Sequence, residues 1–271
     1  MRIIKSSIIK VMKFLGLLDT RFYRYIRTKG FSCGLVALGE RNNYSIPAKW
    51  ITVDIENADF NINFLNFSSL PFQSESVQMI YSSHMIEYLP PESFNKVIKE
   101  CYRVLKKGGV LRIEAPDAKK IIYAYKNNID DTFLKEYQIQ ANPLITELQY
   151  PNEYASRHVT FLGLLSCYIE HGRHIPVVAK KSEIDQRLST LSLDDFGEWA
   201  VSLQTQEQKN SGGHINIMYY DKISELLRSL NFKNDALKNF KTTDSNNPLI
   251  LSLERLDKHR NACSFIVECF K

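Results

Sequence analysis

The sequence lacks the features that mark several classes of protein. No uninterrupted run of about 18 apolar residues occurs, so we expect no transmembrane helix. The five cysteines are odd in number, contain no CxxC pair and have no histidine placed beside them, which argues against both a disulfide framework and a zinc site. They are typical of buried or incidental thiols in a reducing compartment, so we expect a cytoplasmic protein.

Several catalytic motifs are also missing. The chain contains no GxSxG elbow, no P-loop and no HExxH run, and it shows neither an internal repeat nor a low-complexity tract. What remains is an ordinary globular composition, with 44% hydrophobic and 24% charged residues. A length of 271 residues fits one large α/β domain with an insertion, or one domain with a small cap.

Positive charge is concentrated at the N-terminus. Residues 1–30 hold eight basic side chains and one acidic one, which gives +7, so the other 241 residues sum to −2 within the total of +5. A body so close to neutral argues against a nucleic-acid-binding face spread over the domain. We therefore do not expect nucleic acid as a partner of the domain body.

Apolar residues within positions 1–30 recur at helical spacing, at Ile4, Ile8, Val11, Leu15 and Leu18. Lysines interrupt this region and no A-x-A site follows, which argues against a secretory signal. Three roles stay open for such a helix. It packs on the domain or on the partner in a homodimer, it lies on an anionic membrane surface at the inner face of a membrane, or it contacts nucleic acid.

Short apolar runs alternate with helical patterning between residues 31 and 118. Strands are predicted at Cys33–Leu38, Trp50–Val53, Ser76–Ser82 and Val110–Glu114. A helix is predicted from Glu92 to Leu105, after Pro90 and Pro91, with Gly108 in the turn that ends it. This alternation predicts an α/β fold with a mostly parallel sheet covered on both faces.

The rest of the chain divides into two parts. Residues 119–213 show no strand alternation, and we interpret them as a mostly helical insertion or cap. Residues 214–271 return to the core, with a helix at Asp221–Ser229 and apolar runs at Leu249–Leu253 and Ser264–Phe270 that suit a closing antiparallel hairpin. The predicted organisation is a basic segment at 1–30, a core at 31–118 and 214–271, and an insertion at 119–213.

A stretch of nearly fifty residues, from 70 to 117, contains three runs that carry a resemblance to a known family. They read LPF at 70–72, SVQMIYSSHMIEYL at 76–89 and ECYRVLKKGGVLRIEAPD at 100–117. This order resembles the class I S-adenosylmethionine-dependent methyltransferases, in the branch that acts on small molecules and sugars, and the tail SFIVECFK is similar to that family's last strand. The resemblance implies a Rossmann-like sheet, S-adenosylmethionine as cofactor, and a small polar acceptor such as a sugar, a nucleotide sugar or a surface-glycan intermediate of polysaccharide biosynthesis.

The resemblance also implies where the cofactor binds. In an open parallel sheet, ligands lie outside the carboxyl ends of the strands, and Asp54 ends the second strand, where a carboxylate can accept hydrogen bonds from ribose hydroxyls. Asn66 and Phe67 occupy the place where the family reads the adenine. Ser82 is expected at the mouth between cofactor and substrate. The alternatives are a helix cap or turn for Asp54 and a plain surface turn for Asn66 and Phe67.

The first loop departs from the family's pattern. Gly39 follows the first strand, but Arg41 stands where a second glycine would let the backbone approach the cofactor's amino-acid end. Its side chain either clashes with the methionine moiety, turns away, or clasps the methionine carboxylate. Pro47 shortens or removes the usual first helix. Arg41 thus keeps open a second function, that of a catalytically silent methyltransferase-like subunit that binds or regulates a partner.

Methyl transfer to a hydroxyl requires a base that removes the proton, and histidine is the usual one because its pKa lies near neutrality. His84 follows the third predicted strand and is the first candidate, although it could instead only hydrogen-bond the loop. His174, in the insertion, and His214, after two glycines, are the others. We also expect a run such as Glu170–His174 to reach an acidic or phosphorylated substrate.

A metal site is not predicted. His171 and His174 with Glu170 offer ligand types that metals bind, but histidines three residues apart without a third placed ligand are a weak signal.

Overall fold

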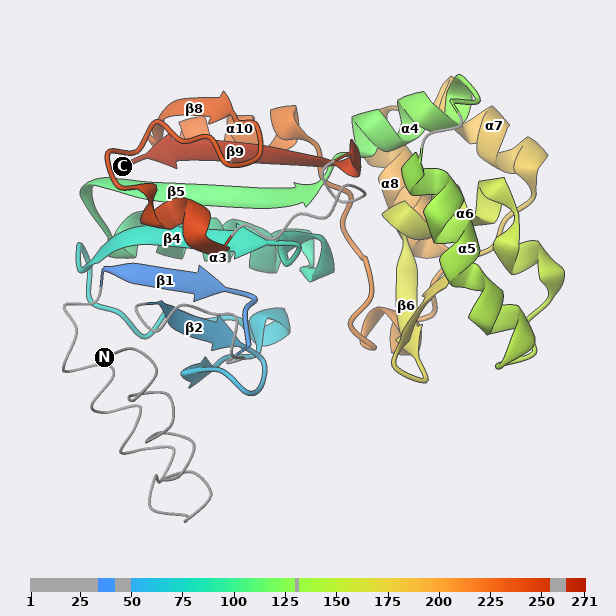
Figure 1. The fold of residues 1–271 in the computed structure, drawn as a ribbon, viewed down its shortest axis with the longest axis horizontal. Coiled ribbons are helices and arrows are strands. Elements are labelled where there is room, and N and C mark those ends of the chain that lie inside the picture. The colour runs from blue at the N-terminus through green and yellow to red at the C-terminus, as the bar shows by residue number, and fades with distance from the viewer. Residues whose placement is uncertain (1–33, 42–49, 130–131, 254–261) are drawn as a thin grey trace, which may run out of the picture.

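A computed structural model of the protein describes residues 34–41, 50–129, 132–253 and 262–271. The basic segment at 1–30 and the stretch around Pro47 lie outside the described residues, so the interpretations of both stay predictions. Two bodies lie side by side in the described part of the chain (Figure 1). One is a twisted sheet with helices against it, and the other is a mostly helical body built from the insertion.

The sheet confirms the predicted fold class. Its described strands run in the order β3-β2-β1-β4-β5-β9-β8, and β1 to β5 pair in parallel while β9 pairs antiparallel with both β5 and β8. The bounds are β1 (Leu35–Leu38), β2 (Ile51–Asp54), β3 (Phe60–Asn61), β4 (Val77–Ser83), β5 (Leu105–Pro116), β8 (Lys233–Leu237) and β9 (Ser264–Phe270). A parallel sheet with an antiparallel edge is a Rossmann-like arrangement.

The register brings the ends of the central strands to one edge. Leu38, the last residue of β1, lies opposite Val53 in β2 and opposite Ser82 in β4. All four residues of β1 are buried, as expected for a strand covered on both faces. In Figure 1 the arrowheads of β1, β2, β4 and β5 point toward the insertion. The residues that follow these strands therefore face it.

Helix α3 (Pro91–Val104) confirms the helix predicted before the fourth strand, and its apolar face is buried in the core of the sheet. The predicted end of the helix, Leu105, agrees with the structure to within one residue, but the prediction that Gly108 lies in a turn that ends the helix was wrong. The helix ends at Val104, and Gly108 lies within β5, where it has a φ of 73° and its N–H donates to the carbonyl of Lys271 over 2.8 Å. Leu105 is fully buried and pairs with Val77, so the chain enters the sheet as soon as the helix stops.

The closing hairpin is only partly as predicted. Strand β9 confirms the run Ser264–Phe270, and helix α10 (Tyr220–Ser229) confirms the late helix. The run Leu249–Leu253 is not a strand, because it lies in the 3₁₀ helix η4 (Pro248–Leu253), whose Ile250 and Leu253 are buried in one cluster with Trp50. The partner of β9 is β8, an edge strand without a buried face and so without an alternating pattern.

The insertion is mostly helical, as interpreted from the sequence. It holds α4 (Ala118–Lys126), α5 (Thr132–Thr146), the 3₁₀ helix η3 (Asn152–Ala155), α6 (Arg157–Leu165), α7 (Lys181–Thr190), α8 (Leu193–Ser202) and α9 (Gln206–Lys209). A hairpin of β6 (Cys167–Glu170) and β7 (Arg173–Pro176) was not predicted. Its turn is His171-Gly172, with φ values of 51° and 71°, and two residues with positive φ suit the twist of a two-residue hairpin.

Among the residues that the structure describes, no helix is both long and apolar enough to cross a membrane.

One ion pair lies entirely inside the sheet. Arg112 in β5 and Glu268 in β9 face each other in the register, both side chains are fully buried, and Arg112 Nη1 donates to Glu268 Oε2 over 3.0 Å. Glu268 also accepts hydrogen bonds from the Thr243 hydroxyl and the Asp244 N–H, over 2.7 and 2.8 Å. These bonds offset part of the cost of removing the two charges from water.

We expect Arg112→Met to lower the free energy of unfolding by about 3–5 kcal/mol in urea titrations, because Glu268 would keep a buried charge without its partner. The matched control is Lys96→Met, which removes an exposed pair with Glu92 and should cost less than about 1 kcal/mol. Equal costs for the two variants would contradict a specific role for the buried pair.

Candidate active site

The turn after β1 requires glycine. Gly39 has a φ of 73°, and a Cβ atom placed there would lie 2.6 Å from Cβ of Met85, so neither the backbone nor the space admits a side chain. The N–H of Gly39 donates to the carbonyl of Val53 over 2.8 Å. This bond holds the end of β1 against β2. The Gly39 predicted for the cofactor loop therefore has a steric reason to be glycine.

Asp54 and Arg41 lie together at this edge. Asp54 Oδ1 accepts the N–H of Ile55 over 2.5 Å, while Arg41 Nε is 3.8 Å from Asp54 Oδ2. Arg41 Nη1 is closer to Glu56, 2.9 Å from its Oε1, and the arginine side chain is 54% exposed. Burial raises the pKa of Asp54, and the Ile55 N–H and the guanidinium oppose this. Of the three orientations considered for Arg41, the structure shows one in which it is paired outward with Glu56.

This edge fits the nucleoside part of S-adenosylmethionine. The contact of Arg41 with Asp54 is longer than a hydrogen bond, so Asp54 Oδ2 keeps the capacity to accept one from a ribose hydroxyl. Ser82, near the end of β4, is buried, and its hydroxyl has no hydrogen-bond partner among the described residues. A buried hydroxyl of this kind is a candidate for a ligand contact.

Asn66 and Phe67 occupy different environments. Asn66 is exposed at the end of the 3₁₀ helix η1 (Phe64–Asn66), whereas the Phe67 ring is buried in the core and stacks on Phe64 with the ring centroids 5.6 Å apart. The predicted reading of adenine by these two residues stays a prediction.

His84 lies between two buried carboxylates just beyond β4. Its Nδ1 is 3.2 Å from Glu87 Oε1, in the 3₁₀ helix η2 (Ile86–Tyr88), and its Nε2 is 3.3 Å from Glu114 Oε1, in β5. The Ser264 hydroxyl, in β9, is 3.0 Å from the same Nε2. The backbone of His84 is left-handed, with a φ of 47°, and its N–H donates to the Glu114 carbonyl over 2.9 Å. His84 thus ties three segments of the sheet edge together.

The carboxylates keep the imidazole of His84 charged. Burial lowers the pKa of His84, but the adjacent Glu114 and Glu87 outweigh this and raise it to about 9. At neutral pH both ring nitrogens therefore carry protons, and a base must have a free lone pair. This geometry favours a positioning role, so the prediction of His84 as general base is not favoured.

A cavity of about 480 Å³ lies between the carboxyl ends of β4 and β5 and the insertion. All three histidines predicted as catalytic line it, namely His84, His174 and His214. Its wall also includes Tyr88 of η2, Tyr137 of α5, Tyr154 of η3, Thr160 of α6 and Arg173 of β7. A concave, partly apolar space of a few hundred Å³ with convergent polar groups is typical of a small-molecule site.

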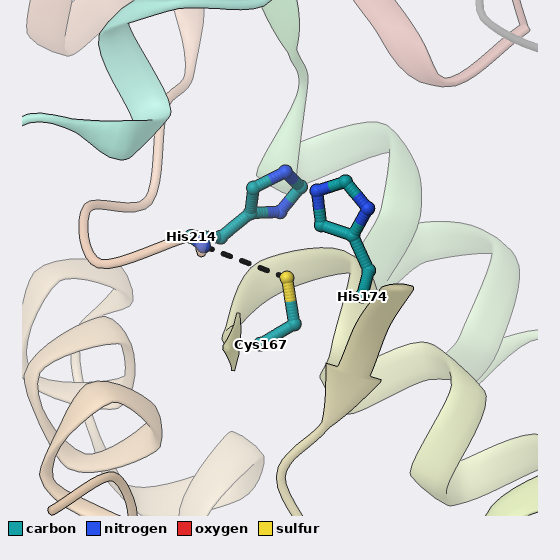
Figure 2. Close-up of side chains that lie close together, drawn as sticks. All are labelled: Cys167, His174 and His214. Carbon is teal, nitrogen blue, oxygen red and sulfur yellow. Dashed lines mark hydrogen bonds between the residues drawn. The ribbon is translucent and has the colours of Figure 1, made fainter. Parts of the chain in front are cut away.

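Two of these histidines meet a cysteine in the cavity wall. Cys167 of β6, His174 of β7 and His214 of the returning loop each offer one ligand atom, and these atoms all lie within 4.8 Å of one another (Figure 2). The His214 N–H donates to Cys167 Sγ over 3.5 Å. The expectation that no histidine accompanies a cysteine was wrong, because the hairpin and the loop bring together residues distant in the sequence.

The environment of His214 acts on its charge in two directions. Burial lowers the pKa of His214, but the Cys167 sulfur beside it, the Glu87 carboxylate and the Leu164 carbonyl together raise it to about 9.

One signal in the sequence could have predicted that Cys167 and His174 lie close together. His171-Gly172 is a two-residue hairpin turn, which would have placed Cys167 and His174 on paired strands.

Comparisons with known proteins gave one family match and several similar structures. Residues 42–113 match the sequence family described as "Methyltransferase domain". Curated proteins gave no match. A solved S-adenosylmethionine-dependent methyltransferase from Archaeoglobus fulgidus is similar at 12% identity and a TM-score of 0.38, over 98% of this chain and 99% of the other. One from Mesorhizobium loti is similar at 10% identity and a TM-score of 0.40, over 89% and 92% of the two chains.

The family match and the strand order support an S-adenosylmethionine-dependent methyltransferase with a Rossmann-like core. Enzymes of this class use S-adenosylmethionine as the cofactor. The strand edge formed by Gly39, Asp54 and Ser82 fits the nucleoside part of this cofactor.

The charged state of His84 predicts a pH dependence of stability. Its pKa in the folded chain is about 9, above the usual 6.5, so the stabilisation is complete below pH 6.5 and is lost as the pH rises through 9. Between pH 6.5 and 9.5 we expect the wild type to lose roughly 3 kcal/mol more than His84→Gln. Urea titrations at several pH values measure this, and taking the difference between the two chains cancels other titrating groups. Parallel pH profiles would contradict the charged His84.

Proposed function

We propose that this chain transfers the methyl group of S-adenosylmethionine to a small polar acceptor, such as a sugar, a nucleotide sugar or a surface-glycan intermediate. The observation that carries the proposal is the 480 Å³ cavity that opens next to the strand edge suited to the cofactor. Its size suits a compact acceptor, and its wall combines aromatic rings with hydrogen-bonding groups.

The cofactor edge and the cavity are adjacent through β4. Ser82 lies near the end of this strand, and His84, two residues further on, lines the cavity. A cofactor held along the tips of β1, β2 and β4 would thus have the cavity as its neighbour. Its sulfonium supplies an electrophilic methyl group, and the task of the protein is to align the acceptor with it and accept the acceptor's proton.

The wall of the cavity suits a hydroxylated acceptor. The rings of Tyr88, Tyr137 and Tyr154 offer both flat apolar faces and hydroxyl groups. Arg173 adds a guanidinium, which is fixed by a 2.6 Å hydrogen bond to Glu147 Oε2 and can pair with a phosphate or carboxylate on the acceptor. These groups support the sugar and nucleotide-sugar classes.

Binding of S-adenosylhomocysteine tests the cofactor part of the proposal. We expect calorimetry to show binding to the wild type and about 10- to 100-fold weaker binding to Asp54→Ala, the cost of one hydrogen bond to a charged group. Glu92→Gln is the matched control, because it removes an exposed carboxylate that pairs with Lys96 in its own helix, and this variant should bind nearly as the wild type does. Absence of any heat or thermal shift with the wild type at millimolar ligand would remove the proposal.

One observation favours the second function, that of a catalytically silent methyltransferase-like subunit. Arg41 lies in the loop that should approach the cofactor, 3.8 Å from Asp54, which suits a silent subunit that binds or regulates a partner. In that case Arg41→Gly would gain affinity for S-adenosylhomocysteine that the wild type lacks. Tight binding by the wild type would count against it.

Filling the cavity should separate acceptor binding from cofactor binding. Ala141 of α5 is buried in its wall, so Ala141→Phe should lower methyl transfer at least about 10-fold while the affinity for S-adenosylhomocysteine changes little. Transfer is measured as methylated product by mass spectrometry on a panel of sugars, nucleotide sugars and lipid-linked glycan intermediates. Unchanged transfer in the variant would place the acceptor elsewhere.

The N-terminal segment at 1–30 adds two proposals that its sequence supports. Its basic amphipathic pattern suits contact with an anionic membrane surface on the cytoplasmic side, or with the partner in a homodimer.

A further inference from the structure

We infer that Cys167, His174 and His214 form a binding site for a transition-metal ion of the Zn²⁺ type, open toward the cavity. The three residues come from β6, from β7 and from the loop before α10, and their ligand atoms lie within 4.8 Å of one another. Figure 2 shows the two imidazole rings side by side near the sulfur of Cys167.

The ligand types select the metal class. One thiolate sulfur and two imidazole nitrogens are soft and borderline donors, which bind Zn²⁺ or Co²⁺ in preference to the oxygen-seeking Mg²⁺ and Ca²⁺. Binding would release the proton of the Cys167 thiol to solvent, because the thiolate is the ligand.

The backbone is built to hold His214 over Cys167. A Cβ atom on Gly213 would lie 1.9 Å from the carbonyl oxygen of Cys167, so only glycine lets the loop pass this close to β6. Gln204 fastens the loop, since its Nε2 donates to the His214 carbonyl over 2.8 Å and to the Ser166 hydroxyl over 2.9 Å. The proximity of the two side chains is therefore a consequence of the fold.

The histidines are oriented as metal ligands commonly are. His214 Nδ1 lies 3.0 Å from the Leu164 carbonyl, which can only accept, so Nδ1 keeps its proton and Nε2 is the nitrogen left for the metal. Because the ring is protonated at neutral pH, the metal would displace the second proton from Nε2. His174 Nε2 is 3.1 Å from the Tyr88 hydroxyl, and the Tyr88 ring also packs edge-on against His214 at 5.0 Å between centroids. Hydrogen bonds of this kind fix the ring orientations and the tautomer of a metal-binding histidine.

The three ligand atoms lie slightly farther apart than they would around a bound Zn²⁺ ion. Around Zn²⁺, bonds of about 2.0–2.3 Å in a tetrahedron place ligand atoms roughly 3.5 Å apart. The three atoms, now within 4.8 Å, would move together by about 1 Å. His174 is an exposed residue on a short hairpin and can make this movement by side-chain rotation.

Three protein ligands leave a fourth position, and all three residues line the cavity. Structural zinc sites are closed by four protein ligands, whereas catalytic sites keep one position for water or substrate. Resting on the proposed function, we assign this position to the acceptor's hydroxyl, whose pKa the metal would lower. The hydroxyl would then release its proton to solvent, and its oxygen would form the bond to the methyl carbon as the bond between that carbon and the sulfonium sulfur breaks. His174 and His214 then act as ligands, and the metal takes the place of a histidine base.

Cobalt spectroscopy on the full-length protein is the first test. After treatment with chelator, Co²⁺ titration should give one tightly bound ion per chain, with a sulfur-to-cobalt charge-transfer band and the intense visible bands of four-coordinate cobalt. X-ray absorption of the Zn²⁺-loaded protein should show one sulfur and two imidazoles. Absence of the charge-transfer band, or a zinc shell without sulfur, would overturn the inference without the use of any variant.

Matched variants test the ligand set. Cys167→Ser, His174→Gln and His214→Gln should each weaken Co²⁺ binding by more than about 100-fold, beyond the ~10–100-fold that loss of an outer hydrogen-bond partner costs. Cys263→Ser and His171→Gln are the controls, because Cys263 lines the same cavity and His171 lies in the same hairpin, but neither belongs to the cluster. Equal losses in controls and ligand variants would contradict the site.

Binding of S-adenosylhomocysteine to the same samples separates the two proposals. Metal binding without nucleoside binding would keep the site and remove the methyltransferase proposal. Nucleoside binding without the cobalt bands would do the reverse. If both hold, a Cys167→Ser chain that binds S-adenosylhomocysteine normally should lose methyl transfer.

Discussion

The positive charge of His84 between Glu87 and Glu114 is the constraint on which the described active-site region depends. Two buried carboxylates at the end of a sheet would repel each other and lose their hydration, and the imidazolium between them offsets both costs. The pair comes from η2 and β5, so the same ring fixes the spacing of two segments. His84 itself lines the cavity between the sheet and the insertion, so the position of one cavity residue is fixed by these contacts.

The residues of the candidate site come from both bodies of the chain, the sheet and the insertion. The sheet contributes the edge with Gly39, Asp54 and Ser82, where short strands and a steric requirement for glycine leave little freedom. The insertion contributes the hairpin of β6 and β7, whose Cys167 and His174 face the loop that carries His214. The proposed cofactor site and the proposed acceptor site thus use different elements, which meet at the cavity.

The sequence predicted most of the sheet and three histidines of the cavity wall, but not the contact of two of them with Cys167. Strands β1, β2, β4 and β5 and helix α3 are apolar runs and periodic faces that local patterning reveals. Strand β8 was not predicted because it is an edge strand with mostly polar residues and no apolar alternation. The run Leu249–Leu253 was predicted as a strand because a partly buried 3₁₀ helix has the same apolar composition as a strand. Cys167 and His214 are 47 residues apart, so their contact depends on tertiary packing that no local pattern contains.

The insertion leaves the core just after β5 and returns just before α10, so both of its connections lie at the carboxyl-end side of the sheet. The insertion can therefore change in length or in the side chains of its wall while the strands behind it keep their pairing. Under the proposed function, an exchange of the insertion at these two junctions would change the acceptor preference and leave the proposed cofactor edge unchanged.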